Sequence, residues 1–119
     1  MTKNTDEFVI YHNPRCSKSR VVLELLQQRG ITPKIIEYLK IPPTKDELRD
    51  VIKKLGIKPE ALLRKNEEVF KEHFSDRNLS EAECVTAMAE NPVLIERPIV
   101  IRGGRAVVGR PLERVLELL

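Results

Sequence analysis

The sequence has few aromatic residues and no long apolar segment. Its 119 residues include three Phe, two Tyr and no Trp, so the core of the folded protein is expected to be mostly aliphatic. No apolar run approaches the roughly 20 residues that a helix needs to cross a bilayer. The first seven residues are polar and of mixed charge, unlike a secretory signal peptide. We therefore expect a cytoplasmic protein that has no membrane partner.

The charge of the chain is nearly balanced. The formal net charge is +3, and the 21 basic and 18 acidic residues are interspersed along the sequence. A protein that binds nucleic acid concentrates its basic residues on one face, so this pattern favours no nucleic-acid partner. A length of 119 residues is typical of one domain with a modest core. We predict a single domain over residues 1–119.

Cysteine and histidine are also scarce. The two cysteines, Cys16 and Cys84, form no Cys-x-x-Cys motif, because Ser19 occupies the position of the second cysteine. Neither they nor the two histidines, His12 and His73, have the spacing of metal ligands, so we expect no metal and no bound cofactor. Stable disulfides are rare in the cytoplasm, and both cysteines are therefore expected to be thiols.

The position of Cys16 points to chemistry. A strand pattern over about residues 8–12 stops at the turn pair Asn13-Pro14, and a helical pattern begins at or just after Cys16. Unpaired backbone N–H groups and the positive end of the helix dipole gather at a helix N-terminus. Such a place binds anions and stabilises a thiolate. Cys16 is therefore predicted to be a reactive thiol beside an anion site.

The middle of the chain is predicted to be helical. A first helix over about 16–29 and a strand over about 34–39 precede it. Two capping boxes, in which a Ser or Thr is followed three residues later by Glu, mark the starts of its longer helices. These boxes are Thr44 with Glu47 and Ser80 with Glu83.

The C-terminal part has the pattern of a hairpin followed by a helix. Strands are predicted over about 99–101 and 106–108, around a turn at Gly103-Gly104. Pro111 then begins a last helix, which contains the apolar residues Val115, Leu116 and Leu119. The predicted order is therefore β-α-β, a helical block, and β-β-α.

This order, together with four short motifs, carries a resemblance to a known family. An α/β chain with β-α-β and β-β-α halves around a helix-N-terminal cysteine resembles a thioredoxin-like fold, here with a helical insertion at about 44–91. The motifs make the chain similar to the glutaredoxin-coupled arsenate reductase family over essentially its whole length. They are YHNPRCSKSR (11–20), LLRKN (62–66), NPVLIERPIV (91–100) and GRP (109–111).

The resemblance implies roles for individual residues. Cys16 matches the nucleophile of the family, and three arginines match its oxyanion-binding residues. Pro98 matches the proline that thioredoxin-like folds hold in a cis peptide beside the active cysteine. His12 and Asn13 match residues near the nucleophile. The three arginines are Arg64, Arg97 and Arg110.

The resemblance also implies a reaction and its partners. The substrate is arsenate or a similar oxyanion, for which arginine is a suitable ligand. The Cys16 thiolate attacks arsenic, glutathione attacks the resulting thio-arsenate, and glutaredoxin takes up the glutathione as arsenite leaves. Glutathione is thus a co-substrate and glutaredoxin a protein partner.

Several alternatives stay open on the sequence alone. The chain could be a non-enzymatic thiol-based regulator that binds another protein, or a general glutathione-dependent thiol oxidoreductase. Cys84 lies in an amphipathic helix and is interpreted mainly as a packing residue, with a resolving thiol as the other reading. His12 could tune Cys16 or only orient the turn. Ser19 could bond to the Cys16 thiolate or cap the helix.

Overall fold

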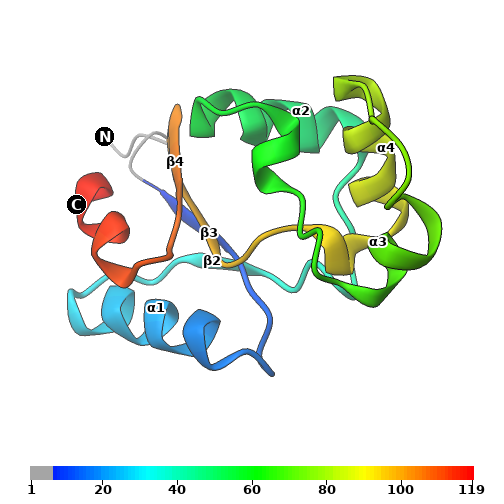
Figure 1. Ribbon diagram of the computed structural model, residues 1–119. Coiled ribbons are helices and arrows are strands. Elements are labelled where there is room, and N and C mark those ends of the chain that lie inside the picture. The colour runs from blue at the N-terminus through cyan, green and yellow to red at the C-terminus, as the bar shows by residue number, and fades with distance from the viewer. Residues whose placement is uncertain (1–6) are drawn as a thin grey trace. The chain divides into compact units, whose positions relative to one another are not determined.

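The computed structural model describes residues 7–119 and contains two compact units (Figure 1). The first combines the two ends of the chain, up to Ile41 and from Arg97 onward, and the second is Pro42–Glu96. The single domain expected from the sequence stays a prediction. The polar N-terminal segment that we compared with a signal peptide lies, up to residue 6, outside the described residues. No helix within residues 7–119 has the length and apolar character needed to span a membrane.

A four-stranded mixed sheet with the strand order β2-β1-β3-β4 forms the centre of the first unit. Strand β1 (Phe8–Tyr11) is parallel to β2 (Lys34–Ile36). It is antiparallel to β3 (Ile99–Arg102), which in turn is antiparallel to β4 (Arg105–Val108). The predicted halves, β-α-β and β-β-α, are thus joined in one sheet by the pairing of β1 with β3.

Two helices, α1 (Ser17–Gln28) and η4 (Leu112–Leu118), pack against one face of this sheet. Residues that face each other across paired strands point to the same side of a sheet, and the register aligns Ile10 with Val100 and Val100 with Val107. These side chains meet the buried residues of the two helices. As expected, the core is almost entirely aliphatic: Phe8, Ile10, Val22, Leu26, Val100, Val107, Val115 and Leu118.

The last helix differs from the prediction. Element η4 is a 3-10 helix in which, for example, Arg114 N–H donates to the Pro111 carbonyl at 3.0 Å. A 3-10 helix has three residues per turn, so residues three apart share a face. Val115 and Leu118 are therefore buried, whereas Leu116 remains 43% exposed. Of the three apolar residues named for this helix, only Val115 is therefore buried.

Strand β2 is shorter than predicted. It ends at Ile36, because the backbone N–H groups of Lys40 and Ile41 both donate to the Glu37 carbonyl at 2.9 Å and turn the chain. Tyr38, which the prediction placed in the strand, is instead buried at this turn. The strand pattern therefore extended to Tyr38 because this residue is buried at a turn and not because it pairs in the sheet.

The second unit is helical, as predicted. Both capping boxes are present, with the Thr44 and Ser80 hydroxyls each accepting the N–H of the glutamate three residues later at 3.1 Å. A short antiparallel bridge between Leu63 and Ile95 joins the middle of the unit to its C-terminal end. Its elements are α2 (Lys45–Leu55), η2 (Pro59–Leu62), α3 (Glu68–His73), α4 (Glu81–Glu90) and η3 (Pro92–Leu94).

Gly109 lies in a tightly packed part of the first unit, directly after β4. A Cβ atom at this position would lie 2.9 Å from Val22 Cγ2, 3.2 Å from Pro98 Cγ and 3.3 Å from Val115 Cγ2. The Gly109 N–H also donates to the Pro98 carbonyl at 2.8 Å. A residue without a side chain is what allows the chain to come this close to α1, and the position of Arg110 follows from it.

We expect Gly109→Ala to lower the free energy of unfolding by about 1–3 kcal/mol, the usual cost of overpacking a filled core. Urea denaturation of the purified variants measures this difference. Gly104→Ala is the matched control, because a Cβ atom there meets nothing within 4 Å. Equal unfolding midpoints for the two variants would show that Gly109 is not packed as described.

Candidate active site at the N-terminus of α1

The turn that carries Cys16 is held by backbone hydrogen bonds. The His12 N–H donates to the Ile36 carbonyl at 2.8 Å, and the Cys16 N–H donates to the Asn13 carbonyl at 3.0 Å. The Asn13 side chain also accepts the Arg15 N–H at 3.0 Å, a bond typical of Asn in turns. Cys16 then occupies the N-cap position of α1 with an extended backbone. Its predicted place at a helix N-terminus is confirmed.

The environment of the Cys16 thiol stabilises the thiolate. Partial burial raises the pKa of this thiol, but hydrogen bonds from the backbone N–H groups of Ser19 and Lys18 and the charge of the Arg97 guanidinium outweigh it. The net effect lowers the pKa below the ordinary cysteine value. Because Cys16 is only partly buried, the thiolate stays open to reagents from solvent. These are the properties of a reactive cysteine.

Two of the predicted arginines belong to the same unit as Cys16. Arg97 comes directly before β3, and its guanidinium donates a hydrogen bond to the Cys16 thiol. Arg110 follows β4 and lines a pocket together with Ser17, the neighbour of Cys16. The peptide bonds from Arg97 to Pro98 and from Arg110 to Pro111 are both cis. The cis proline expected at position 98 is therefore present, and the one at 111 was not anticipated.

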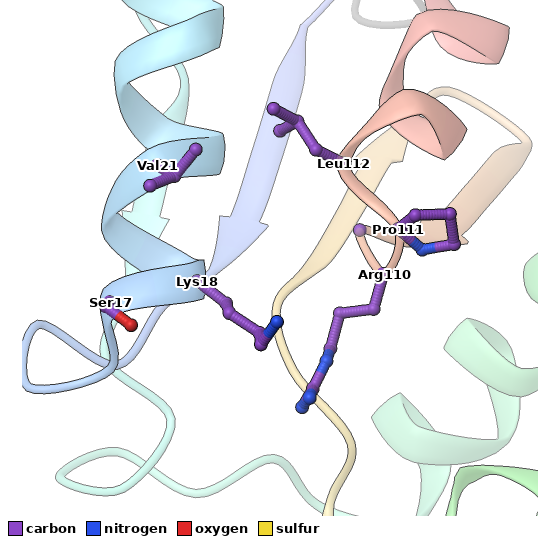
Figure 2. A pocket seen from close by; sticks show the side chains of 7 residues that line it. Ser17, Lys18, Val21, Arg110, Pro111 and Leu112 are labelled. Carbon is purple, nitrogen blue, oxygen red and sulfur yellow. The ribbon is translucent and has the colours of Figure 1, made fainter.

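The pocket beside Cys16 has a volume of about 240 Å³ and lies between α1 and the chain that leads into η4 (Figure 2). The side chains of Lys18 and Arg110 point toward the same end of this space in Figure 2. Val21 and Leu112 extend into it from the two helices. The pocket is therefore cationic at one end and apolar along its walls.

Arg64 belongs to the second unit, where two carboxylates hold it. Its Nη2 lies 2.9 Å from Glu67 Oε2, and its Nε lies 3.9 Å from Glu96 Oε1. Its Nη1 also donates to the Val93 carbonyl at 3.2 Å, and the side chain is 20% exposed. Arg64 is thus an ordered, partly buried cation rather than a solvated one. Its membership of the site stays a prediction.

His12, Asn13 and Ser19 form a small buried network under the Cys16 turn. The Ser19 hydroxyl lies 2.6 Å from His12 Nδ1 and accepts the Asn13 N–H at 3.1 Å. Burial lowers the pKa of His12, more than the nearby Glu37 raises it, so the imidazole is neutral near pH 7. The Ser19 side chain therefore bonds to the turn, and Ser19 contacts the thiol through its backbone N–H. The Ser19 hydroxyl thus neither caps the helix nor bonds to the Cys16 thiolate, the two roles predicted for it.

Cys84 has the opposite environment to Cys16. It lies on the buried face of α4 with a side chain that is 1% exposed. Burial raises the pKa of its thiol, and the charge of Glu60 adds to that increase. A buried cysteine of this kind behaves as a small apolar residue, which favours the packing interpretation over that of a resolving thiol.

We expect Cys16 to be alkylated by iodoacetamide with a midpoint below the pKa of a free cysteine, and Cys84 to react far more slowly. The reason is the set of N–H donors and the Arg97 charge that stabilise the Cys16 thiolate. Rates measured against pH, with peptide mass spectrometry separating the two thiols, test this. Arg97→Gln should move the midpoint up, whereas Arg29→Gln, at the other end of α1, should not. A Cys16 midpoint at or above the free-thiol value would contradict the assignment.

Known proteins are similar to this chain over nearly its whole length, including the residues of the site described above. Residues 11–118 match the model of the ArsC family. The chain is 46% identical over 117 residues to the uncharacterized protein YfgD of Escherichia coli K12, covering 97% of this chain and 98% of that one. It is 44% identical over 115 residues to an arsenate reductase of Neisseria meningitidis serogroup A, covering 95% and 98%.

A solved structure of similar size shares the fold. The structure of an arsenate reductase from Vibrio cholerae superimposes with a TM-score of 0.90 at 49% identity, covering 95% of this chain and 98% of that one. The thioredoxin-like fold and the family predicted from the four motifs are both confirmed. This chain belongs to the ArsC family.

Proposed function

We propose that this protein reduces arsenate to arsenite through a covalent adduct on Cys16, with glutathione and glutaredoxin as the reductant. The observation that carries the proposal is the Cys16 thiol, whose pKa is lowered by helix-N-terminal N–H groups and by Arg97. Relatives that share nearly the whole chain are named arsenate reductases. A glutathione-dependent reaction also fits a chain whose second cysteine is buried. Such a reaction belongs in the cytoplasm.

Arginine suits the proposed substrate. Arsenate is a tetrahedral oxyanion, and a guanidinium group donates paired hydrogen bonds to such oxygens while its own charge is permanent. Arg97 contacts the thiol that would attack arsenic, and Arg110 lines the pocket next to Ser17. We assign both to oxyanion binding. Arg64 is the third proposed ligand, and it would exchange its contact with Glu67 for one with the substrate.

The first proposed step is a condensation without a change of oxidation state. The Cys16 sulfur forms a bond to arsenic(V), one arsenic–oxygen bond breaks, and that oxygen leaves as water with the thiol proton and a proton from arsenate. A thiol with an ordinary pKa of about 8.5 is only a few per cent thiolate at pH 7. The donors around Cys16 therefore increase the fraction of enzyme that can attack.

The later steps transfer two electrons to arsenic. Glutathione displaces a second oxygen as water and becomes bound to arsenic through its sulfur. A glutaredoxin thiolate then attacks that glutathione sulfur, so that a mixed disulfide forms and the electron pair of the sulfur–arsenic bond reduces arsenic(V) to arsenic(III). Water finally hydrolyses the Cys16–arsenic(III) bond, which releases arsenite and regenerates the thiol. Two thiols are oxidised for each arsenate reduced.

The proposal is tested by arsenate-dependent NADPH oxidation, coupled through glutathione reductase, glutathione and glutaredoxin. We expect turnover that Cys16→Ser abolishes and that stops when glutaredoxin is omitted. Folded protein with a reactive Cys16 but no turnover would refute arsenate reduction. Turnover of glutathione mixed disulfides in its place would identify a general thiol oxidoreductase.

The arginines provide a second test in the same assay. Because a hydrogen bond to a charged group is worth about 1.5–3 kcal/mol, Arg97→Gln and Arg110→Gln should each raise the KM for arsenate roughly ten- to hundredfold. Arg49→Gln is the control, since its ion pair with Asp46 is on the surface and such pairs contribute little. Unchanged KM values in the Arg97 and Arg110 variants would exclude them as substrate ligands.

A further inference from the structure

The pocket between α1 and η4 has more room and a different chemistry than arsenate requires. Its volume is about 240 Å³, and arsenate is a single small tetrahedral ion without any apolar part. Val21, Pro111 and Leu112 provide apolar wall, and Val21 is 45% exposed although it is a large aliphatic residue. A ligand that uses this space fully needs an uncharged aliphatic body in addition to an anionic group.

The anionic group has a cation available to it in Lys18. This side chain lines the pocket and points into the same end of it as Arg110 (Figure 2). Within residues 7–119 Lys18 forms no ion pair, so its charge is free to meet a ligand carboxylate. Lys18 also belongs to the first turn of α1, and its backbone N–H donates to the Cys16 thiol. A carboxylate held by Lys18 is therefore bound by a residue whose backbone contacts the reacting sulfur.

We propose that this pocket binds glutathione, the thiol that attacks the Cys16 adduct, with a glutathione carboxylate on Lys18 and the peptide body against Val21 and Leu112. The proposal rests on the proposed function, because that function requires such a thiol. Glutathione fits the pocket's chemistry: it is a tripeptide with a carboxylate at each end and its thiol between them. Anchoring one end at Lys18 leaves the sulfur to reach the arsenic on Cys16.

The packing around the pocket keeps it formed without a ligand. Gly109 is pressed against Val22 and Pro98, and its N–H donates to the Pro98 carbonyl at 2.8 Å. The next residue, Arg110, is held further by its N–H, which donates to the Val108 carbonyl at 2.8 Å. One wall is thus fixed to the sheet and the other is α1. A site formed in advance spends less binding free energy on ordering its own groups.

The binding test uses S-methylglutathione, which keeps both carboxylates and cannot react. Amide chemical shifts in a titration of the ¹⁵N-labelled protein should change at Lys18, Val21 and Leu112. Because a charge-assisted bond is lost, Lys18→Gln should raise the Kd about tenfold, and Lys18→Arg should restore most of the affinity. Val21→Asp should weaken binding as well.

Matched controls come from the edge strand β2 of the same unit. Lys34→Gln removes an exposed charge there, and Ile35→Asp places a carboxylate at a residue that is 46% exposed. Both should leave the Kd for S-methylglutathione unchanged. Shift changes confined to other surfaces, or the same Kd in Lys18→Gln as in the parent protein, would overturn the proposal.

A kinetic test separates this proposal from the proposed function. In the coupled assay, Lys18→Gln should raise the KM for glutathione about tenfold and by much more than it raises the KM for arsenate, since the Lys18 backbone N–H at the Cys16 thiol is retained. Normal arsenate turnover with an unchanged glutathione KM would refute the pocket and leave the function standing. Lys18-dependent binding of S-methylglutathione without arsenate turnover would support the pocket and refute the function.

Discussion

The chemistry of this protein depends on the balance between burial and hydrogen bonding at the Cys16 sulfur. Burial raises the pKa of the thiol, and the N–H groups of Ser19 and Lys18 together with Arg97 lower it by more. The N–H groups are available because the first turn of a helix has no carbonyl partners for them. The tight turn from Asn13 to Cys16 places the sulfur at the N-terminus of α1, beside these N–H groups. The second thiol lies on the buried face of α4, where burial and the charge of Glu60 raise its pKa.

The aliphatic sheet core holds the parts of the site in place. Strand β1 leads into the Cys16 turn, and β3, its neighbour in the sheet, follows directly after Arg97 and Pro98. Strand β4 leads into Gly109 and Arg110, and the absence of a side chain at Gly109 brings that segment against α1. Three segments that are distant in the sequence thus converge on one helix terminus. Short strands are sufficient to position Cys16, Arg97 and Arg110, because each of these residues lies within a few residues of a strand end.

Much of this could be predicted from local patterns. The capping boxes, the hairpin glycines and the strand–turn–helix pattern around Cys16 are local signals, since each depends on contacts within a few residues. Predictions failed where the outcome depended on how the chain folds, over a long distance for the last helix and over a short one for β2 and Ser19. The helix after Pro111 became a 3-10 helix whose buried residues, Val115 and Leu118, are those that meet the sheet core. The Ser19 hydroxyl bonds to His12 and Asn13, because the turn before α1 brings these two residues next to it.

The sequence by itself determined the order of the elements, the presence of a thiol at a helix N-terminus and, through its motifs, the family. These follow from local backbone preferences and from the identity of the residues. The tertiary structure alone decided which groups surround each charged side chain: Arg97 contacts the Cys16 sulfur, Lys18 and Arg110 line one end of a pocket, and Arg64 lies between Glu67 and Glu96. Electrostatic and packing energies depend on distances between segments, and those distances are set only when the strands pair and the helices pack against them.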